Sequence, residues 1–233
     1  MTTFTEAATA VRHLLSSTTV PPAVVDDYLA DAPELWLASA PPELLAGDLA
    51  LCHPDLRPGE VRAAARPIED GLTRLTVMAH DRHGLLADTT GVIAASGFPI
   101  AAASAMTCRR RGIGLHSLAV EADDIGCDGW DRLGARLRGI AGGGRDPVTF
   151  SPIGRARATT TPLPDGHSLI TVRAPDQTGL LWAICSWFAD LGISIETAHV
   201  SGGVDGWVTD RFAVAGSPDV GGLAARLSGD AGD

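Results

Sequence analysis

The sequence predicts an α+β protein with two ferredoxin-like βαββαβ units, each an antiparallel sheet with helices on one face, after a small helical segment. The main observation is a duplication. Residues 75–103 (LTVMAHDRHGLLADTTGVIAASGFPIAAA) and 170–198 (ITVRAPDQTGLLWAICSWFADLGISIETA) match in one register at an offset of about 95 residues. A second observation is that the hydrophobic period changes from helical to alternating near residue 60. Matches held over so many positions indicate a duplicated structural unit.

Residues 1–59 are expected to form a helical N-terminal segment. Apolar side chains recur at intervals of three and four residues across residues 4–15 and again across 24–29, as on one face of a helix. Pro21-Pro22 separates these two helices, and a third is expected after Pro41-Pro42. The segment is too short for a large core of its own, so we expect it to pack on the rest of the chain or to bridge protomers.

Residues 60–157 are expected to hold the first unit, with an extra leading strand. Residues 61–66 alternate in polarity and are predicted to pair as a hairpin with a strand at 72–78. A loop at 80–84 then leads into a helix, which is expected to end at Gly97. Strands at 99–107 and 113–121 and a second helix follow, and residues 148–153 are expected to close the sheet as a strand.

Residues 158–233 are expected to hold the second unit. A strand at 168–174, an apolar helix from 180, strands at 193–200 and 206–215, and a final helix repeat the order of the first unit. The sequence ends at Asp233 and leaves no room for a closing strand. We therefore expect the second unit to be short at its C-terminal end, or to borrow a sheet edge from elsewhere.

The composition is typical of a cytoplasmic globular protein. Hydrophobic residues make up 45% of the chain and charged residues 20%. No signal-peptide pattern is present, and no apolar run approaches the roughly 20 residues that span a bilayer. The net charge of −10 argues against nucleic acid or an anionic membrane as a partner. One basic run, residues 109–111, is interpreted as a solvated hairpin turn.

The sequence does not indicate an enzyme, a metal site or a cofactor. It contains no lysine, which excludes Schiff-base chemistry and the phosphate-binding lysine of a P-loop. Its four cysteines form no CxxC pair and are expected to be reduced thiols. His80-Asp81 invites comparison with a metal-binding dyad, but the second copy has Pro175-Asp176 at these positions. We therefore expect no metal ligands in either loop.

The repeated pattern V-x-A-x-D-x-x-G-L-L, followed by a helix and G-x-x-I-x-x-A, resembles ACT domains, which are small regulatory modules that bind amino acids. The second copy, with APDQTGLL and LADLGISIETAHVS, is also similar to the C-terminal repeats of bacterial PII uridylyltransferase/uridylyl-removing enzymes, without their catalytic modules. The resemblance implies a non-catalytic allosteric sensor in nitrogen metabolism, with glutamine as the first ligand to test. It also implies ligand binding between ACT units that pair within the chain or in a homodimer, and an unidentified regulated protein.

The two loops carry the candidate ligand-binding residues. Each leads from a strand to a helix N-terminus, where the first amides lack intrahelical acceptors and favour an anion such as an α-carboxylate. The loop glycines permit positive φ or close backbone approach, and the aspartates can receive an α-ammonium group or cap the helix. The candidates in the first copy are Asp81, Arg82, His83, Gly84, Leu85, Leu86 and Ile100. Those in the second copy are Asp176, Gln177, Thr178, Gly179, Leu180, Leu181, Ser194 and Ile195.

The residue before the strand isoleucine distinguishes the two copies. ACT domains often have asparagine there, whereas this chain has Pro99 in the first copy and Ser194 in the second. Pro99 lacks both an amide hydrogen and a polar side chain, and Ser194 keeps a hydroxyl group. We therefore favour the second loop as the binding site. The alternative hypothesis is an ACT-fold protein that mediates association without a ligand, which Pro99 and the missing final strand would support.

Overall fold

The computed structural model describes residues 4–121, 127–143, 148–164, 166–202 and 206–229. The α-helices are α1 (Phe4–Leu15), α2 (Pro22–Asp31), α3 (Glu34–Leu37), α4 (Pro42–Leu49), α5 (Leu85–Ala95), α6 (Cys127–Gly139), α7 (Leu180–Asp190) and α8 (Gly221–Ser228). The strands are β1 (Val61–Pro67), β2 (Leu72–His80), β3 (Ile100–Cys108), β4 (Ile113–Glu121), β5 (Arg157–Pro162), β6 (His167–Pro175), β7 (Ile195–Gly202) and β8 (Trp207–Ala215).

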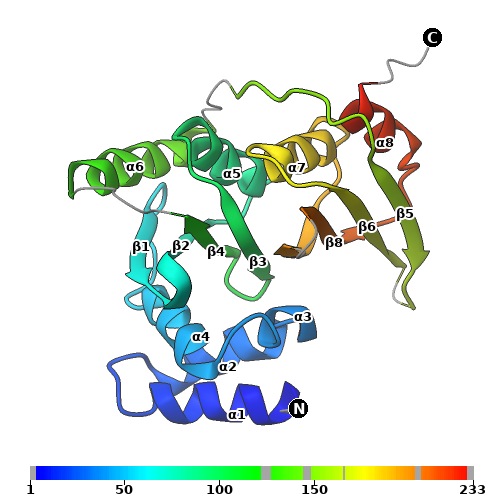
Figure 1. Cartoon of the computed structure of the whole chain (residues 1–233). Coiled ribbons are helices and arrows are strands. Elements are labelled where there is room, and N and C mark those ends of the chain that lie inside the picture. The colour runs from blue at the N-terminus through cyan, green and yellow to red at the C-terminus, as the bar shows by residue number, and fades with distance from the viewer. Residues whose placement is uncertain (1–3, 122–126, 144–147, 165, 203–205, 230–233) are drawn as a thin grey trace.

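Within the described residues, eight strands form one antiparallel sheet in the order β1-β2-β4-β3-β7-β8-β6-β5. Helices α5 to α8 lie along one face of this sheet, and the N-terminal helices lie on the other face (Figure 1). The first four strands belong to the first repeat and the last four to the second. The predicted α+β class, with two βαββαβ-like units behind a helical segment, is confirmed.

The two repeats join through the strand pair β3 and β7 at the centre of the sheet. Their antiparallel register runs from Ala102 opposite Ser201 to Met106 opposite Thr197. On the helical face, α5 and α7 lie next to each other (Figure 1). The pairing of ACT-like sheets that the sequence predicts, within the chain or between chains, is therefore found within the chain.

The edge strands differ from the predicted order. Residues 148–153 were expected to close the first sheet, but they form no strand. The leading strand of each repeat takes the edge position: β1 pairs with β2, and β5 pairs with β6. The second sheet is therefore complete, because residues before its loop, and not after its last helix, supply the edge. A preceding and a following strand can fill the same place when both run antiparallel to the neighbouring strand.

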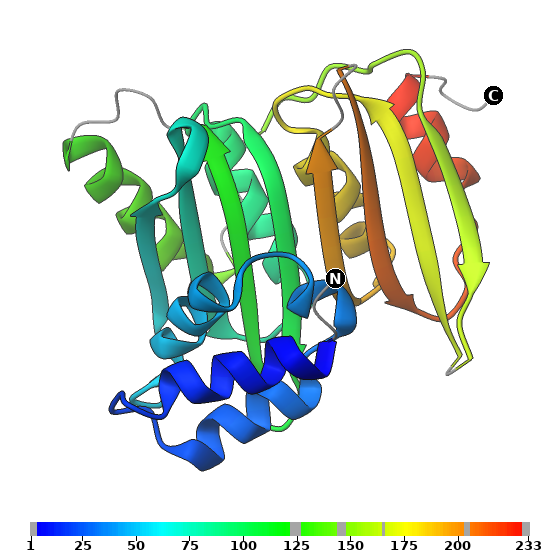
Figure 2. The same ribbon diagram turned by 60° about the horizontal axis from the view of Figure 1, so that its bottom comes forward.

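The N-terminal helices pack on the sheet of the first repeat, as one of the two sequence hypotheses proposed. Figure 2 shows them over one half of the sheet. Alternation along the strands divides the side chains between two cores. Val77 lies in the core beneath α5 to α8, and its neighbour Met78 lies in a second core with Trp36 and Leu45 of the helical segment. Burial of such side chains stabilises the contact by about 1.5–3 kcal/mol each.

A buried polar network also fixes the helical segment to the sheet. The Asp48 carboxylate of α4 accepts hydrogen bonds from Arg74 Nε at 3.1 Å, from Thr76 Oγ1 at 2.6 Å and from Ser117 Oγ at 2.7 Å. Asp48 is fully buried and Arg74 is 6% exposed. Because three partners satisfy the carboxylate, this buried charge is compensated and specifies how α4 lies on the sheet.

The basic run at residues 109–111 forms the predicted turn between β3 and β4; Arg109 and Arg110 are more than half exposed, as a solvated turn requires, but the side chains also form ion pairs. Arg110 pairs with Asp31, and Arg111 Nη1 lies 2.8 Å from Asp55 Oδ1. Arg109 Nη2 lies 2.6 Å from Glu196 Oε2 in the second repeat. The turn therefore joins the acidic helical segment to the sheet, and the two repeats to each other.

Candidate functional site

Two pockets lie where the repeats meet, and each combines a loop from one repeat with a strand start from the other. The Asp81 pocket is lined by Asp81, Arg82, Leu85, Leu86, Ser194 and Ile195, among others. The Asp176 pocket is lined by Asp176, Gln177, Leu180, Leu181, Pro99 and Ile100, among others. Central pairing of β3 with β7 produces this exchange, because it sets each loop opposite the other repeat.

The two loops have the same backbone design. The Asp81 amide donates to Gly112 O at 2.8 Å, and the Asp176 amide donates to Gly206 O at 2.9 Å. Gly84 and Gly179 then take positive φ angles of 76° and 90° immediately before α5 and α7. The positive φ predicted for these glycines is confirmed. Each helix thus begins at the pocket wall, where its first amides can bind an anion.

The predicted residues divide between the pockets in a definite way. Asp81, Arg82, Gly84, Leu85 and Leu86 lie together with Ser194 and Ile195 of the second repeat. Asp176, Gln177, Thr178, Gly179, Leu180 and Leu181 lie together with Ile100 of the first repeat. Pro99 therefore faces the second loop, and Ser194 faces the first. The sequence-based preference for the second loop assumed that each loop lies beside the strand of its own copy, so that Ser194 would serve the second loop. That premise was wrong, because Ser194 lines the Asp81 pocket.

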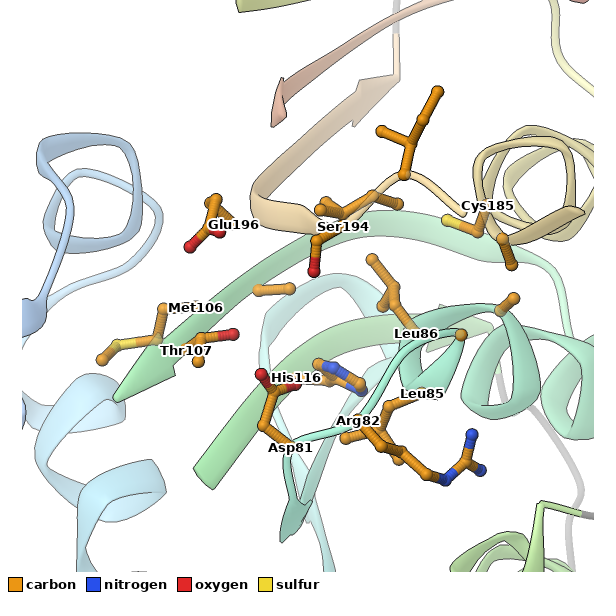
Figure 3. Close-up of a pocket in the computed structure, with 16 residues that line it drawn as sticks. Asp81, Arg82, Leu85, Leu86, Met106, Thr107, His116, Cys185, Ser194 and Glu196 are labelled. Atoms are coloured by element: carbon orange, nitrogen blue, oxygen red, sulfur yellow. The ribbon is translucent and has the colours of Figure 1, made fainter. Parts of the chain in front are cut away.

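His83 is separate from both sets. Its Nε2 lies 2.7 Å from the carbonyl oxygen of Ala189 in α7, so the ring links the first loop to a helix of the second repeat. The neighbouring Arg82 also points away from Ser194 and Glu196 (Figure 3). Its guanidinium group pairs with Asp88 and donates to Ile140 O at 2.6 Å. These two side chains hold the loop in place.

The Asp81 pocket is small, with a volume of about 30 Å³. Figure 3 shows Asp81 and His116 on one side and Ser194 and Glu196 on the other. His116 is 5% exposed, and its Nδ1 lies 3.0 Å from Thr89 Oγ1. Burial, and then the charge of Arg82, lower the pKa of His116 to about 4, so the ring is neutral at pH 7. Burial also raises the pKa of Asp81.

The Asp176 pocket is larger, with a volume of about 220 Å³. Its loop is held in place because Gln177 Nε2 donates to Ser151 O, at 2.7 Å, in the segment that connects the repeats. Polar groups converge on it from three directions: Asp176 and Thr178 from the loop, Glu121 from the end of β4, and Asp210 from β8. Apolar side chains such as Leu180 and Ile100 complete the walls, so the pocket offers both polar and apolar contacts to a small molecule.

Asp210 and His116 are pocket residues that the sequence did not indicate. Both lie on the helical face of the sheet at corresponding places: His116 is opposite Val77, and Asp210 is opposite Val172. A signal was present in residues 207–215, because Asp210 interrupts the alternating apolar series Val208, Phe212 and Val214. An aspartate on the buried face of a strand is uncommon and therefore informative.

In the described part of the chain, no three or more His, Cys, Asp or Glu side chains form a group that could hold a metal ion. Nor does any of the described helices have the length and apolar character required to cross a bilayer. Of the cysteines, Cys52, Cys108 and Cys185 are free and buried. Burial raises the pKa of the Cys52 and Cys108 thiols to about 11, so they are inert thiols at neutral pH. The Cys127 side chain lies outside the described residues.

One family model matches a part of this chain that includes the second loop. Residues 168–231 match the family model of the ACT domain. The match runs through β6, α7, β7, β8 and α8, so the second repeat is similar to ACT domains over most of its length. The duplicated first repeat has the same arrangement of strands and helices in the same sheet.

More distant comparisons add less. No curated protein matches the chain. Among solved structures, aspartate kinase from Synechocystis is similar, with 16% identity and a TM-score of 0.41 over 69% of this chain. The chain spans about a quarter (26%) of that kinase chain. The predicted relation to PII uridylyltransferases has no support from these comparisons and stays a prediction.

Proposed function

We propose that this chain is a non-catalytic, cytoplasmic regulatory protein that binds a free amino acid in the Asp176 pocket. The observation that carries the proposal is the difference between the two related pockets. The Asp176 pocket, at about 220 Å³, is several times larger than the Asp81 pocket, at about 30 Å³, and so offers more room for a small organic molecule. The family match includes the loop of the larger pocket.

The walls of the Asp176 pocket suit the two charged groups that all free amino acids share. The N-terminus of α7, reached through Gly179, presents backbone amides and the positive end of the helix dipole to an α-carboxylate. The Asp176 carboxylate can receive an α-ammonium group through charge-assisted hydrogen bonds. Glutamine is the first side chain to test, because of the resemblance of APDQTGLL and the residues after it to the uridylyltransferase repeats.

The position of the pocket supplies a route for regulation. A ligand there would contact the loop of the second repeat and Ile100 of the first, so it would favour one packing of the repeats over others. A ligand shifts a conformational equilibrium only by such differential binding. The helical segment and the free sheet edges β1 and β5 are candidate surfaces for a regulated protein and for the predicted homodimer.

Thermal melting tests this function. Each of the twenty amino acids is added at millimolar concentration, and one or a few should raise the melting temperature, because a ligand that binds only the native state stabilises it. Melting of Asp176→Ala should be insensitive to the same amino acids. A folded wild-type protein with an unchanged melting temperature across the whole set would contradict the sensor function.

Association without a ligand is the second candidate function. Pro99 favours it, because this residue lines the larger pocket without an amide hydrogen and its carbonyl oxygen already accepts from the Glu121 amide at 3.0 Å. Sedimentation analysis with and without amino acids separates the two functions. A stable assembly that forms equally in both conditions, together with a flat melting response, would favour the association function.

A further inference from the structure

Asp210 lines the Asp176 pocket, and one of its two carboxyl oxygens lacks a hydrogen-bond partner among the described residues. It is 1% exposed, and no hydrogen-bond partner for its Oδ1 occurs among the described residues. The side chain lines the pocket, together with Thr90 and Val200 of neighbouring elements. A buried carboxyl oxygen without a partner costs free energy, so its retention points to a partner that enters the pocket.

In the first repeat, the buried ionisable side chain at the corresponding position has a hydrogen-bond partner. His116 occupies the corresponding place, and its ring bonds the hydroxyl group of Thr89 on α5. In the second repeat, the residue of α7 that corresponds to Thr89 is Ile184, which offers no hydroxyl group. The repeat that has the small pocket therefore satisfies its buried ionisable group internally, and the repeat that has the large pocket does not.

The charges around Asp210 define what the missing partner should be. Asp176 and Glu121 also line the pocket, and its lining includes no arginine, lysine or histidine. Cys185 of α7 is the other titratable group close to Asp210, and burial, with the Asp210 charge second, raises the pKa of this thiol, so it stays neutral. Three carboxyl groups without a compensating cation favour a positively charged donor over a neutral or anionic one.

We propose that Asp210 binds the ammonium group of the amino acid, together with Asp176, and so selects ligands that carry this group. The inference rests on the proposed function and assigns to it a binding residue outside the loop motif. On binding, the Asp210 carboxyl group releases its proton to solvent, and the ligand keeps its ammonium protons. The ammonium group then donates to the carboxylate as a charge-assisted hydrogen bond.

Burial, and then the charge of Asp176, raise the pKa of Asp210 to about 8, so most molecules of the unliganded protein carry a proton on this group at pH 7. The ligand must displace that proton. Affinity should therefore rise about tenfold from pH 6 to pH 7 and level off above pH 8. Asp210→Asn keeps the shape but cannot ionise, so it should bind at least about tenfold more weakly at pH 8 and lose this pH dependence.

Isothermal titration at pH 6, 7 and 8 tests the proposal, with the twenty L-amino acids as probes on the full chain. The variants are Asp210→Asn and its matched control His116→Asn, which changes the corresponding residue of the small pocket. For any amino acid that binds, the form of the same acid without its amino group provides a second probe. Wild type and His116→Asn should bind with rising affinity, Asp210→Asn should bind weakly at every pH, and the deaminated acid should not bind.

The outcomes separate this inference from the proposed function. If an amino acid binds wild type and Asp210→Asn equally, with the same pH profile, the role of Asp210 is overturned and the sensor function stands. Equal binding of the deaminated acid would likewise overturn ammonium recognition. If none of the twenty binds the folded wild-type protein, the proposed function fails, and this inference fails with it.

Discussion

His116 and Asp210 occupy corresponding positions in the two repeats, one opposite Val77 and the other opposite Val172. Both are buried beneath the helices, and burial shifts their pKa values in opposite directions: to about 4 for the imidazole and to about 8 for the carboxyl group. Both groups are therefore mainly neutral at pH 7. The duplicated chain thus carries a buried ionisable group at the same place in each pocket, and the two groups differ in chemistry and in hydrogen bonding.

The lowered pKa of His116 leads us to expect that the protein loses stability in acid. Its folded-state pKa of about 4 lies below the ordinary histidine value of 6.5, so below pH 6.5 the unfolded chain takes up a proton that the native protein does not. The free energy of unfolding should fall by about 1 kcal/mol per pH unit between pH 6.5 and 4 on account of this residue. Urea denaturation of wild type and His116→Asn at pH 6.5, 5.5 and 4.5 measures the slope, which should be shallower in the variant. Parallel slopes would contradict the assignment.

The raised pKa of Asp210 leads us to expect a loss of stability as the pH rises. Its folded-state pKa of about 8 exceeds the ordinary aspartate value of 3.8, so the native protein holds a proton that the unfolded chain has lost. Stability from this group is present in acid and decreases as the pH rises towards 8. Asp210→Asn should therefore gain about 1 kcal/mol per pH unit relative to wild type between pH 5 and 8. Chemical denaturation of both proteins across that range tests this, and a constant difference would show that Asp210 is ionised throughout.

The two loops predict a difference between matched variants. Asp176→Ala should abolish the rise in melting temperature that an amino acid causes, and Asp81→Ala should leave it intact. Gly179→Val and Gly84→Val add a second pair, because both glycines have positive φ and each valine should cost about 1–3 kcal/mol of strain. Melting curves without amino acid should show a lower melting temperature for both glycine variants. Curves with amino acid should show that only Gly179→Val has lost the ligand-induced rise in melting temperature. Loss of response in Asp81→Ala alone would place the site in the other pocket.

The buried pair between the helical segment and the sheet predicts a large mutational effect. Asp48→Ala leaves the Arg74 guanidinium group buried without its carboxylate and should cost about 3–5 kcal/mol. The matched control is Asp26→Ala, which removes a pair with Arg12 whose side chains are about half exposed and should cost no more than about 1 kcal/mol. Urea denaturation measures both. Equal small effects would mean that the helical segment is not held by this network.

Much of the fold was predictable because its signals are local. The alternation in β1 and β6, the glycines before α5 and α7 and the apolar faces of those helices follow from residues close together in sequence. Because the two copies match in sequence, an element predicted in one copy was also expected in the other. The loop residues of both pockets were found in this way, because their residue types are constrained by the backbone of the turn.

The remainder depends on contacts that a single sequence does not specify. Any free strand edge presents similar backbone groups, so neither the central pairing of β3 with β7 nor the pairing of the edge strand β5 with β6 could be predicted, whereas the β1–β2 hairpin was predicted and is confirmed. The first of these pairings decides that Pro99 faces the second loop. Likewise, the partners of Arg109 and Arg111 lie on distant elements, Glu196 and Asp55, and no local pattern connects them.

The most direct test of the account is the stoichiometry of amino-acid binding, measured by isothermal titration of the full-length protein at pH 8. The two pockets are related by duplication, but the account assigns binding only to the Asp176 pocket. It therefore predicts one amino acid per chain in wild type and in Asp81→Ala, and none in Asp176→Ala. Two bound molecules per chain, or one that persists in Asp176→Ala, would contradict it.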